Sequence, residues 1–248
     1  MRQFTQARIA LGRTGSSLPT EEVLQFGYAH AMAQDAVHLP LDVDALCASL
    51  HAADFPTLRV NSRAGDRGTY LLRPDLGRRL EAESVAALQA AKPEKPLDLL
   101  LVVGDGLSSL AIQKHALPML EAIRRIAPQD WQIGPVVVAS QARVALGDEV
   151  GEALGARLVA ILIGERPGLS SPDSLGMYLT YEPRVGRHNA ERNCISNVRT
   201  EGLSYATAAH KLLWLAQEGL RLKLTGVDLK DESDMILIAP PAEIKQLP

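Results

Sequence analysis

The chain has 248 residues, of which 46% are apolar and 22% are charged, so it can bury a core of ordinary globular size. Its formal net charge of −3 gives no basic surplus, which argues against a nucleic-acid-binding protein, and no apolar run approaches the roughly 20 residues that span a bilayer. The two cysteines, Cys47 and Cys194, exclude a disulfide-stapled fold and fit a reducing, cytoplasmic environment.

Residues 1–72 are expected to form a helical and extended N-terminal region, and the part up to Leu50 is expected to stand apart from any sheet. Thr20 precedes two acidic residues and is the expected N-cap of a helix that ends at His38. Asp42 is the expected N-cap of a second helix, which runs to Leu50. Two shorter features follow, a β-like run and a glycine-containing turn, at 57–60 and 64–68.

Residues 73–230 are expected to form an α/β domain, which Asp75 opens as the N-cap of a helix that continues to Ala91. Short apolar runs then predict four strands, at 97–103, 133–139, 158–163 and 177–181. Helices are expected between and after them, at 108–127, 148–154 and 204–224. This alternation favours a doubly wound, Rossmann-like parallel sheet. Residues 231–248 are expected to form a tail that lies on the surface or is poorly ordered.

A candidate site follows the strand at 158–163. This run has the length and the β-branched content of a strand buried on both faces, and Gly164 and Gly168 punctuate the chain after it. Between these glycines lie Glu165 and Arg166, at the carboxyl end of the strand, where open α/β sheets bind ligands. The alternative is an ordinary turn with a solvated pair of charges.

A second candidate is the run Gly-Asp-Gly-Leu-Ser-Ser at 104–109, which lies between a strand and a helix as a dinucleotide fingerprint would. The third glycine of that fingerprint is replaced by Ser109, and no acidic residue closes the next strand, so the pattern argues against a nicotinamide dinucleotide. A turn at a helix start can still present backbone amides to a polar ligand group. A turn that serves chain geometry alone remains the alternative.

The titratable side chains suggest no metal centre and no catalytic group. The six histidines are scattered, and none has metal-ligand spacing to another histidine or a cysteine. Cys194 lies in a polar segment, beyond the fourth predicted strand, that is expected to be a loop. It can be a catalytic thiol or a small side chain packed against a ligand.

Four stretches, in this order and at these spacings, resemble the small subunit of ethanolamine ammonia-lyase. They are Arg-Pro-Asp-Leu-Gly-Arg-Arg-Leu at 73–80, Gly-Asp-Gly-Leu-Ser at 104–108, Gly-Glu-Arg-Pro-Gly-Leu at 164–169 and Cys-Ile-Ser-Asn at 194–197. The resemblance implies an enzyme that uses adenosylcobalamin to convert ethanolamine to acetaldehyde and ammonia by radical chemistry. It also implies a hetero-oligomer in the cytoplasm or in a bacterial microcompartment, with no membrane or nucleic-acid partner.

The resemblance further implies how the work is divided between the subunits. The large subunit, a (β/α)8 barrel, carries the substrate site and the catalytic residues, and this chain closes over the cobalamin between them. Carried over by motif, the cobalamin contacts fall on Val144, Glu165 and Cys194, with no catalytic residue and no metal ligand in this chain. Glu165 is expected to stay ionised beside Arg166. No histidine is expected to bind cobalt, because the chain has no Asp-x-His-x-x-Gly motif. The nearest match, at 35–38, has the wrong spacing and no following glycine, and His38 is also expected at a helix end away from the sheet edge.

Two rival hypotheses remain at this point. The first is a stand-alone nucleotide-using enzyme built on the turn at 104–106, and the second is a scaffold protein whose charged loops only bind a partner. Nucleotide binding by the isolated chain would favour the first. Tight cobalamin binding that needs a partner chain would favour the radical lyase over both.

Overall fold

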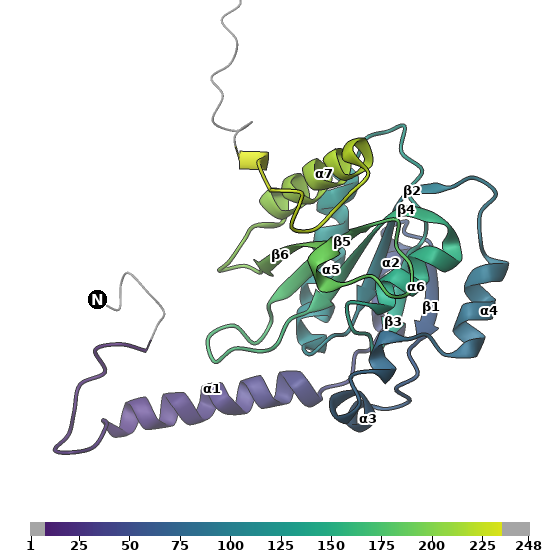
Figure 1. The fold of residues 1–248 in the computed structure, drawn as a ribbon. Coiled ribbons are helices and arrows are strands. Elements are labelled where there is room, and N and C mark those ends of the chain that lie inside the picture. Colours follow the sequence, from purple (N-terminus) through teal and green to yellow (C-terminus); the bar gives the residue numbers. More distant parts are fainter. Residues whose placement is uncertain (1–7, 235–248) are drawn as a thin grey trace, which may run out of the picture.

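The structure is a computed structural model, and it describes residues 8–234. It is an α/β fold built on one six-stranded sheet, which confirms the predicted class (Figure 1). The expected tail lies outside the described residues from position 235 onward. The strands of the sheet are β1 (Thr57–Asn61), β2 (Leu97–Gly104), β3 (Val136–Ser140), β4 (Ala156–Gly164), β5 (Leu175–Tyr181) and β6 (Arg192–Val198).

The sheet has the order β1-β3-β2-β4-β5-β6 and is mostly parallel. The first four strands pair in parallel, as the alternation of strands and helices predicts. The expected parallel direction does not extend to the fourth predicted strand, because β5 runs antiparallel to β4, and β6 in turn runs antiparallel to β5. The chain from β4 to β5 is a short loop with no helix, and such a connection returns in the opposite direction. The segment that carries Cys194 is therefore strand β6 and not a loop.

Helices cover both faces of the sheet. The helices of the structure are α1 (Thr20–His38), α2 (Val43–Ala52), α3 (Arg67–Leu72), α4 (Ala82–Ala90), α5 (Ser109–Ile126), α6 (Leu146–Leu154) and α7 (Tyr205–Leu222), with short 3-10 turns η2 (Leu76–Arg78) and η3 (Asn189–Glu191). One apolar cluster lies between the sheet and α2, α5 and α7, and a second lies between the sheet and α4 and α6. This two-faced burial explains why the central strands read as unbroken apolar runs.

The order of the strands reverses at β2. The chain goes from β2 through α5 to β3 on one side, and from β3 through α6 back to β4 on the other side of β2. Such a reversal opens a crevice beyond the carboxyl ends of the two central strands, which is where ligands bind in sheets of this kind. The ends of β2 and β4 therefore mark the first place to look for a site.

The N-terminal region differs from its prediction in how it joins the sheet. The expectation that the chain up to Leu50 stands apart is wrong for α2, because Leu46, Cys47 and Leu50 are buried in the core, and β1 is an edge strand of the same sheet. The expectation that this region stands apart is right for most of α1, which extends beyond the layers of the domain (Figure 1) and buries only Ala36. The division of the chain at residues 72 and 230 stays a prediction.

The helix starts show which capping predictions were right. Asp42 and Ser108 each accept a hydrogen bond from a backbone N–H three residues further on, as N-caps do. Thr20 is not a cap, because α1 begins one residue earlier than expected and Pro19 occupies the cap position without a side-chain bond. Asp75 does not open α4 either, since its carboxylate bonds the guanidinium of Arg73.

Candidate functional site

A cavity of about 390 Å³ lies at the crevice between the ends of β2 and β4. Its wall is made by α3, by the turn after β2, by the loop after β3, by the end of β4 and by the middle of β5. The lining residues are Tyr70, Gly106, Leu107, Arg143, Val144, Ile163, Gly164, Glu165, Arg166 and Tyr178. We call this the switch-point cavity. Two of the three predicted cofactor contacts, Val144 and Glu165, line it.

Two glycines allow the strand ends to meet at the floor of this cavity. Gly106 has a φ of +59°, and a Cβ built on it would lie 2.2 Å from the carbonyl oxygen of Gly164. A Cβ on Gly164 would lie 2.0 Å from the carbonyl oxygen of Ser108. The N–H of Leu107 donates to Gly164 O at 2.9 Å, which joins the turn after β2 to the end of β4. Both glycines are required by this contact, because any side chain would separate the two strand ends.

The same turn shows that the dinucleotide-like pattern is used for structure. The N–H of Gly106 donates to the carboxylate of Asp105 at 3.0 Å, and that of Leu107 is bound to Gly164. The Ser108 hydroxyl caps α5, and the Ser109 hydroxyl bonds the carbonyl of Leu39. These groups are therefore not free to cradle a phosphate. The rival hypothesis of a nucleotide-using enzyme loses its main support.

Glu165 is positioned by hydrogen bonds that the sequence does not suggest. Its Oε2 accepts from the Ser174 hydroxyl and, at 3.2 Å, from the N–H of Asn197. Its side chain packs over Gly176, where a Cβ would lie 3.0 Å from Oε1. Among residues 8–234 it forms no ion pair with Arg166, so the expectation that Arg166 interacts with this carboxylate is wrong. Oε1 is left without a hydrogen-bond donor from the described part of the chain.

Val144 is held in place by the loop before it, which a buried aspartate organises. Asp105 accepts hydrogen bonds from the N–H groups of Gln141 and Ala142 at 2.9 and 2.8 Å, and it pairs with Arg67 at 3.6 Å. Burial raises the pKa of Asp105, although these donors and Arg67 act in the opposite direction. The carboxylate thus fixes the β3–α6 loop against the end of β2, and Val144 follows two residues later.

Cys194 does not line the switch-point cavity, but it adjoins it through Tyr178. The two residues pair across β5 and β6, and Tyr178 lies on the cavity wall. The Cys194 side chain is partly exposed, yet the protein around its sulfur removes enough water to raise the pKa of the thiol. A raised pKa leaves little thiolate at neutral pH, which argues against a catalytic nucleophile. It favours the alternative of a small side chain near a ligand.

Two tyrosines of the cavity wall were missed by sequence reasoning. Tyr70 is fully buried, and two guanidinium groups lie over its ring, that of Arg67 at 4.7 Å and that of Arg143 at 4.1 Å from the ring centre. Its hydroxyl donates to Ala142 O, and burial raises its pKa to about 12. Burial likewise raises the pKa of Tyr178. Both hydroxyls therefore stay neutral at physiological pH.

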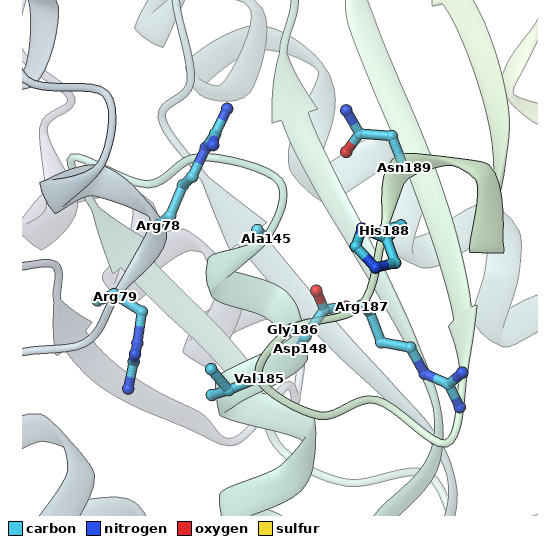
Figure 2. A pocket seen from close by; sticks show the side chains of 9 residues that line it. All are labelled: Arg78, Arg79, Ala145, Asp148, Val185, Gly186, Arg187, His188 and Asn189. Carbon is cyan, nitrogen blue, oxygen red and sulfur yellow. The ribbon is translucent and has the colours of Figure 1, made fainter.

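A second cavity, of about 320 Å³, is lined by Ala145, which follows Val144 in the sequence, by Asp148 of α6 and by the loop before η3 (Figure 2). Charged side chains line it, but most of them are paired with residues outside the lining. Arg79 bonds Glu149 through two nitrogens, Arg187 bonds Glu191, and Asp148 pairs with the buried Arg192. In Figure 2 the guanidinium groups of Arg79 and Arg187 point away from the middle of the cavity. This cavity contains none of the predicted site residues.

The described residues form no metal site at the switch-point cavity, although the carboxylate of Glu165 lines it. Within residues 8–234 no three His, Cys, Asp or Glu side chains come together as a metal site, and no histidine lines this cavity. His38 does lie at a helix end, but the expectation that this end is far from the sheet edge is wrong. Arg67 donates to both Val37 O and Gly106 O, so the end of α1 is bridged to the cavity rim.

None of the helices in the described residues could span a membrane.

The chain is similar to one family of known proteins over almost its whole length. A family model described as ethanolamine ammonia-lyase light chain (EutC) matches residues 1–230. The ethanolamine ammonia-lyase small subunit of Pseudomonas fluorescens (strain Pf0-1) is 55% identical over 95% of this chain and 87% of its own length. The same subunit of Pseudomonas aeruginosa (strain LESB58) is 56% identical over the same shares, and that of Azotobacter vinelandii is 56% identical over 95% of this chain and 88% of its own length.

Proposed function

Because this chain belongs to the ethanolamine ammonia-lyase light-chain family, we propose that it helps to hold adenosylcobalamin at the interface with a large subunit. As a small subunit it is one member of an ammonia-lyase complex that has a larger partner chain. In our proposal the complex converts ethanolamine to acetaldehyde and ammonia by radical chemistry. It works in the cytoplasm or inside a bacterial microcompartment.

The observation that carries this proposal is the switch-point cavity. Val144 and Glu165, from different loops, both line it, and Cys194 adjoins it through Tyr178. At about 390 Å³ the cavity is open and small, and a cobalamin with its corrin ring, amide side chains and nucleotide tail could only rest against it. One wall from this chain and a second from a partner would then enclose the cofactor.

The donor and acceptor groups of the cavity fit such a ligand. The amide side chains of a corrin donate and accept hydrogen bonds, and the free Oε1 of Glu165 can accept from one of them. Tyr178 and Val144 offer an aromatic and an apolar surface to the ring. When bound, adenosylcobalamin supplies the radical chemistry, and the residues of this chain bind it, orient it and exclude water.

Within residues 8–234 no group of side chains has the arrangement that would catalyse the reaction by itself. Cys194 is held as a thiol, and neither Cys194 nor the cavity has a histidine beside it to act as a base. Glu165 is committed to Ser174 and Asn197, which suits a positioning role better than proton transfer. We therefore assign the substrate site and the catalytic groups to the large subunit.

The proposal is tested with purified subunits, alone and mixed. We expect the mixture, and neither subunit alone, to release ammonia from ethanolamine in the presence of adenosylcobalamin. We also expect cobalamin to co-migrate with the mixture in gel filtration, detected by its visible absorbance. Ammonia release by this chain alone, or a mixed complex that assembles but leaves cobalamin in the free fraction, would contradict the proposal.

A further inference from the structure

The wall of the switch-point cavity carries a positive charge that has no counter-charge. Arg143 and Arg166 line it, and among residues 8–234 Glu165 is the one carboxylate in the lining. The neighbouring arginines are neutralised, since Arg67 pairs with Asp105 and Arg79 pairs with Glu149. Charged groups at a ligand site usually have a partner of opposite sign, in the protein or in the ligand.

Arg166 has no ion pair and no hydrogen bond within residues 8–234. Glu165, its neighbour in sequence, is turned toward Ser174 and Asn197 and does not bind it. The side chain of Arg166 is exposed at the cavity mouth, where a ligand can reach it. Its guanidinium is therefore available, and no contact in the described chain gives it a structural purpose.

Arg143 is available in a different way, because its side chain is already fixed. Its Nη2 donates to Tyr70 O at 3.0 Å, and its guanidinium lies over the Tyr70 ring. Nε is buried without a partner, whereas Nη1 is not among the buried unpaired atoms and forms no hydrogen bond in the described chain. A guanidinium held in this way loses little conformational entropy when its free N–H groups bind a ligand.

We infer that Arg166 and Arg143 form an anion subsite that takes the phosphodiester in the nucleotide tail of cobalamin. The inference rests on the proposed function. Guanidinium groups bind phosphate oxygens through strong charge-assisted hydrogen bonds. The amides around a corrin ring are neutral, so the phosphodiester is the group at its periphery that matches the unpaired charge of the wall. Glu165 and Val144 would hold the ring side of the cofactor, and the two arginines its tail.

The subsite is tested by visible-spectrum titration of the two-subunit complex with two truncated corrinoids. Cobinamide lacks both the phosphate and the base of the tail, and cobinamide phosphate restores the phosphate alone. We expect Arg166→Ala to weaken binding of cobinamide phosphate and of cobalamin by about ten- to a hundredfold, the effect of one lost charge-assisted hydrogen bond. Binding of cobinamide should stay within about twofold, and Arg166→Lys should recover part of the loss.

Arg78→Ala is the matched control, since Arg78 is an exposed arginine with no ion pair in the described chain, but it lines the second cavity. It should leave the affinity for all three corrinoids unchanged.

The inference is overturned if Arg166→Ala weakens the binding of cobinamide as much as that of cobinamide phosphate, or if it weakens the binding of neither. It is also overturned if the variant impairs assembly with the large subunit without any dependence on the phosphate, because the arginine then pairs with a carboxylate of that subunit. Failure of the wild-type complex to bind cobalamin at all would contradict the proposed function itself.

Discussion

Glu165 has a fixed position before any ligand binds, because Ser174, Asn197 and Gly176 surround its side chain. We predict that Glu165→Gln weakens cobalamin binding in the two-subunit complex by up to about ten- to a hundredfold, since one charge-assisted hydrogen bond is lost. Turnover at saturating cofactor should hold. Spectral titration and steady-state assays at several cobalamin concentrations measure the two effects separately. A collapse of turnover with unchanged affinity would show that Glu165 takes part in the chemistry.

The positions of the histidines lead to a prediction about cobalt. None of them lines the switch-point cavity within the described residues, so we expect the cofactor to keep its own base as the lower axial ligand. The test is electron paramagnetic resonance of cob(II)alamin in a complex whose small subunit alone contains nitrogen-15 histidine. The axial nitrogen hyperfine splitting should not change on labelling. An altered splitting would identify a histidine of this chain as the ligand.

The sequence allowed part of the site to be predicted at the level of single residues. Val144 and Glu165 follow strands whose apolar runs are easily recognised, so their place at the sheet edge could be inferred. Tyr70 and Tyr178 could not be found in this way. Tyr70 enters the site from a six-residue helix, too short to show a period, and Tyr178 lies in the middle of a strand whose direction the sequence does not specify.

Among the elements, α6 is joined to the segment before α4 by one ion pair. Nε and Nη2 of Arg79 both donate to Glu149, and the N–H of Leu80 adds a third bond. Burial would raise the pKa of Glu149, but these bonds outweigh it and lower the pKa. A carboxylate with a lowered pKa stabilises the fold above its unfolded pKa, and this contribution is lost as the pH falls through the folded pKa.

We therefore predict that Glu149→Gln lowers the free energy of unfolding by about 1–2 kcal/mol at pH 7, with an allowance for the partial exposure of Arg79. The difference from wild type should shrink below a pH of about 4.5, the ordinary pKa of the side chain. Urea denaturation across this range measures it. The control is Glu94→Gln, at an exposed loop position where the glutamate has no hydrogen bond or ion pair within residues 8–234. A difference that grows toward acidic pH would contradict the assignment.

The contact between the turn after β2 and the end of β4 leads to a second prediction for the elements. Gly106→Ala should destabilise the protein by more than about 3 kcal/mol, because the new Cβ would lie 2.2 Å from Gly164 O at a positive φ. Gly27→Ala is the matched control. Gly27 has open space around it within α1, so this change should be neutral or raise helix stability by up to about 1 kcal/mol. Thermal unfolding of both variants decides the matter, and equal midpoints would show that the turn can rearrange.

Strand existence was easier to predict than strand direction or edge strands. The central strands are buried on both faces and give apolar runs that no other element explains. Strand β6 was expected to be a loop because its sequence is mostly polar, and several of its residues, such as Ser196 and Asn197, are exposed. The antiparallel direction of β5 depends on the length of the loop before it and on pairing with β4, which are tertiary properties.

For the whole molecule, the exposed apolar side chains of α1 have a consequence for its behaviour in solution. Leu24 and Tyr28 are 68% and 70% exposed, one turn apart on a helix that is fastened to the domain by its last turn and by Leu39. We predict that the isolated chain self-associates, and that Leu24→Gln with Tyr28→Gln reduces this. Light scattering after gel filtration measures it. Leu72→Gln, at an 82% exposed position outside α1, is the control and should have little effect. Equal self-association of all three proteins would exclude α1 as the cause.

The strand order also determines when the molecule can be completed during its synthesis. β1 is the first strand to leave the ribosome, and its partner in the sheet is β3, whose residues follow about 80 positions later. At about 5–20 residues per second the ribosome needs roughly 4–16 s to produce that partner. Until then β1 has no neighbouring strand to pair with, and α2 lacks β3, one of the two strands that it packs against. In every round of translation the nascent N-terminal segment therefore leaves apolar side chains of α2, such as Leu46 and Leu50, without their full packing partners for several seconds.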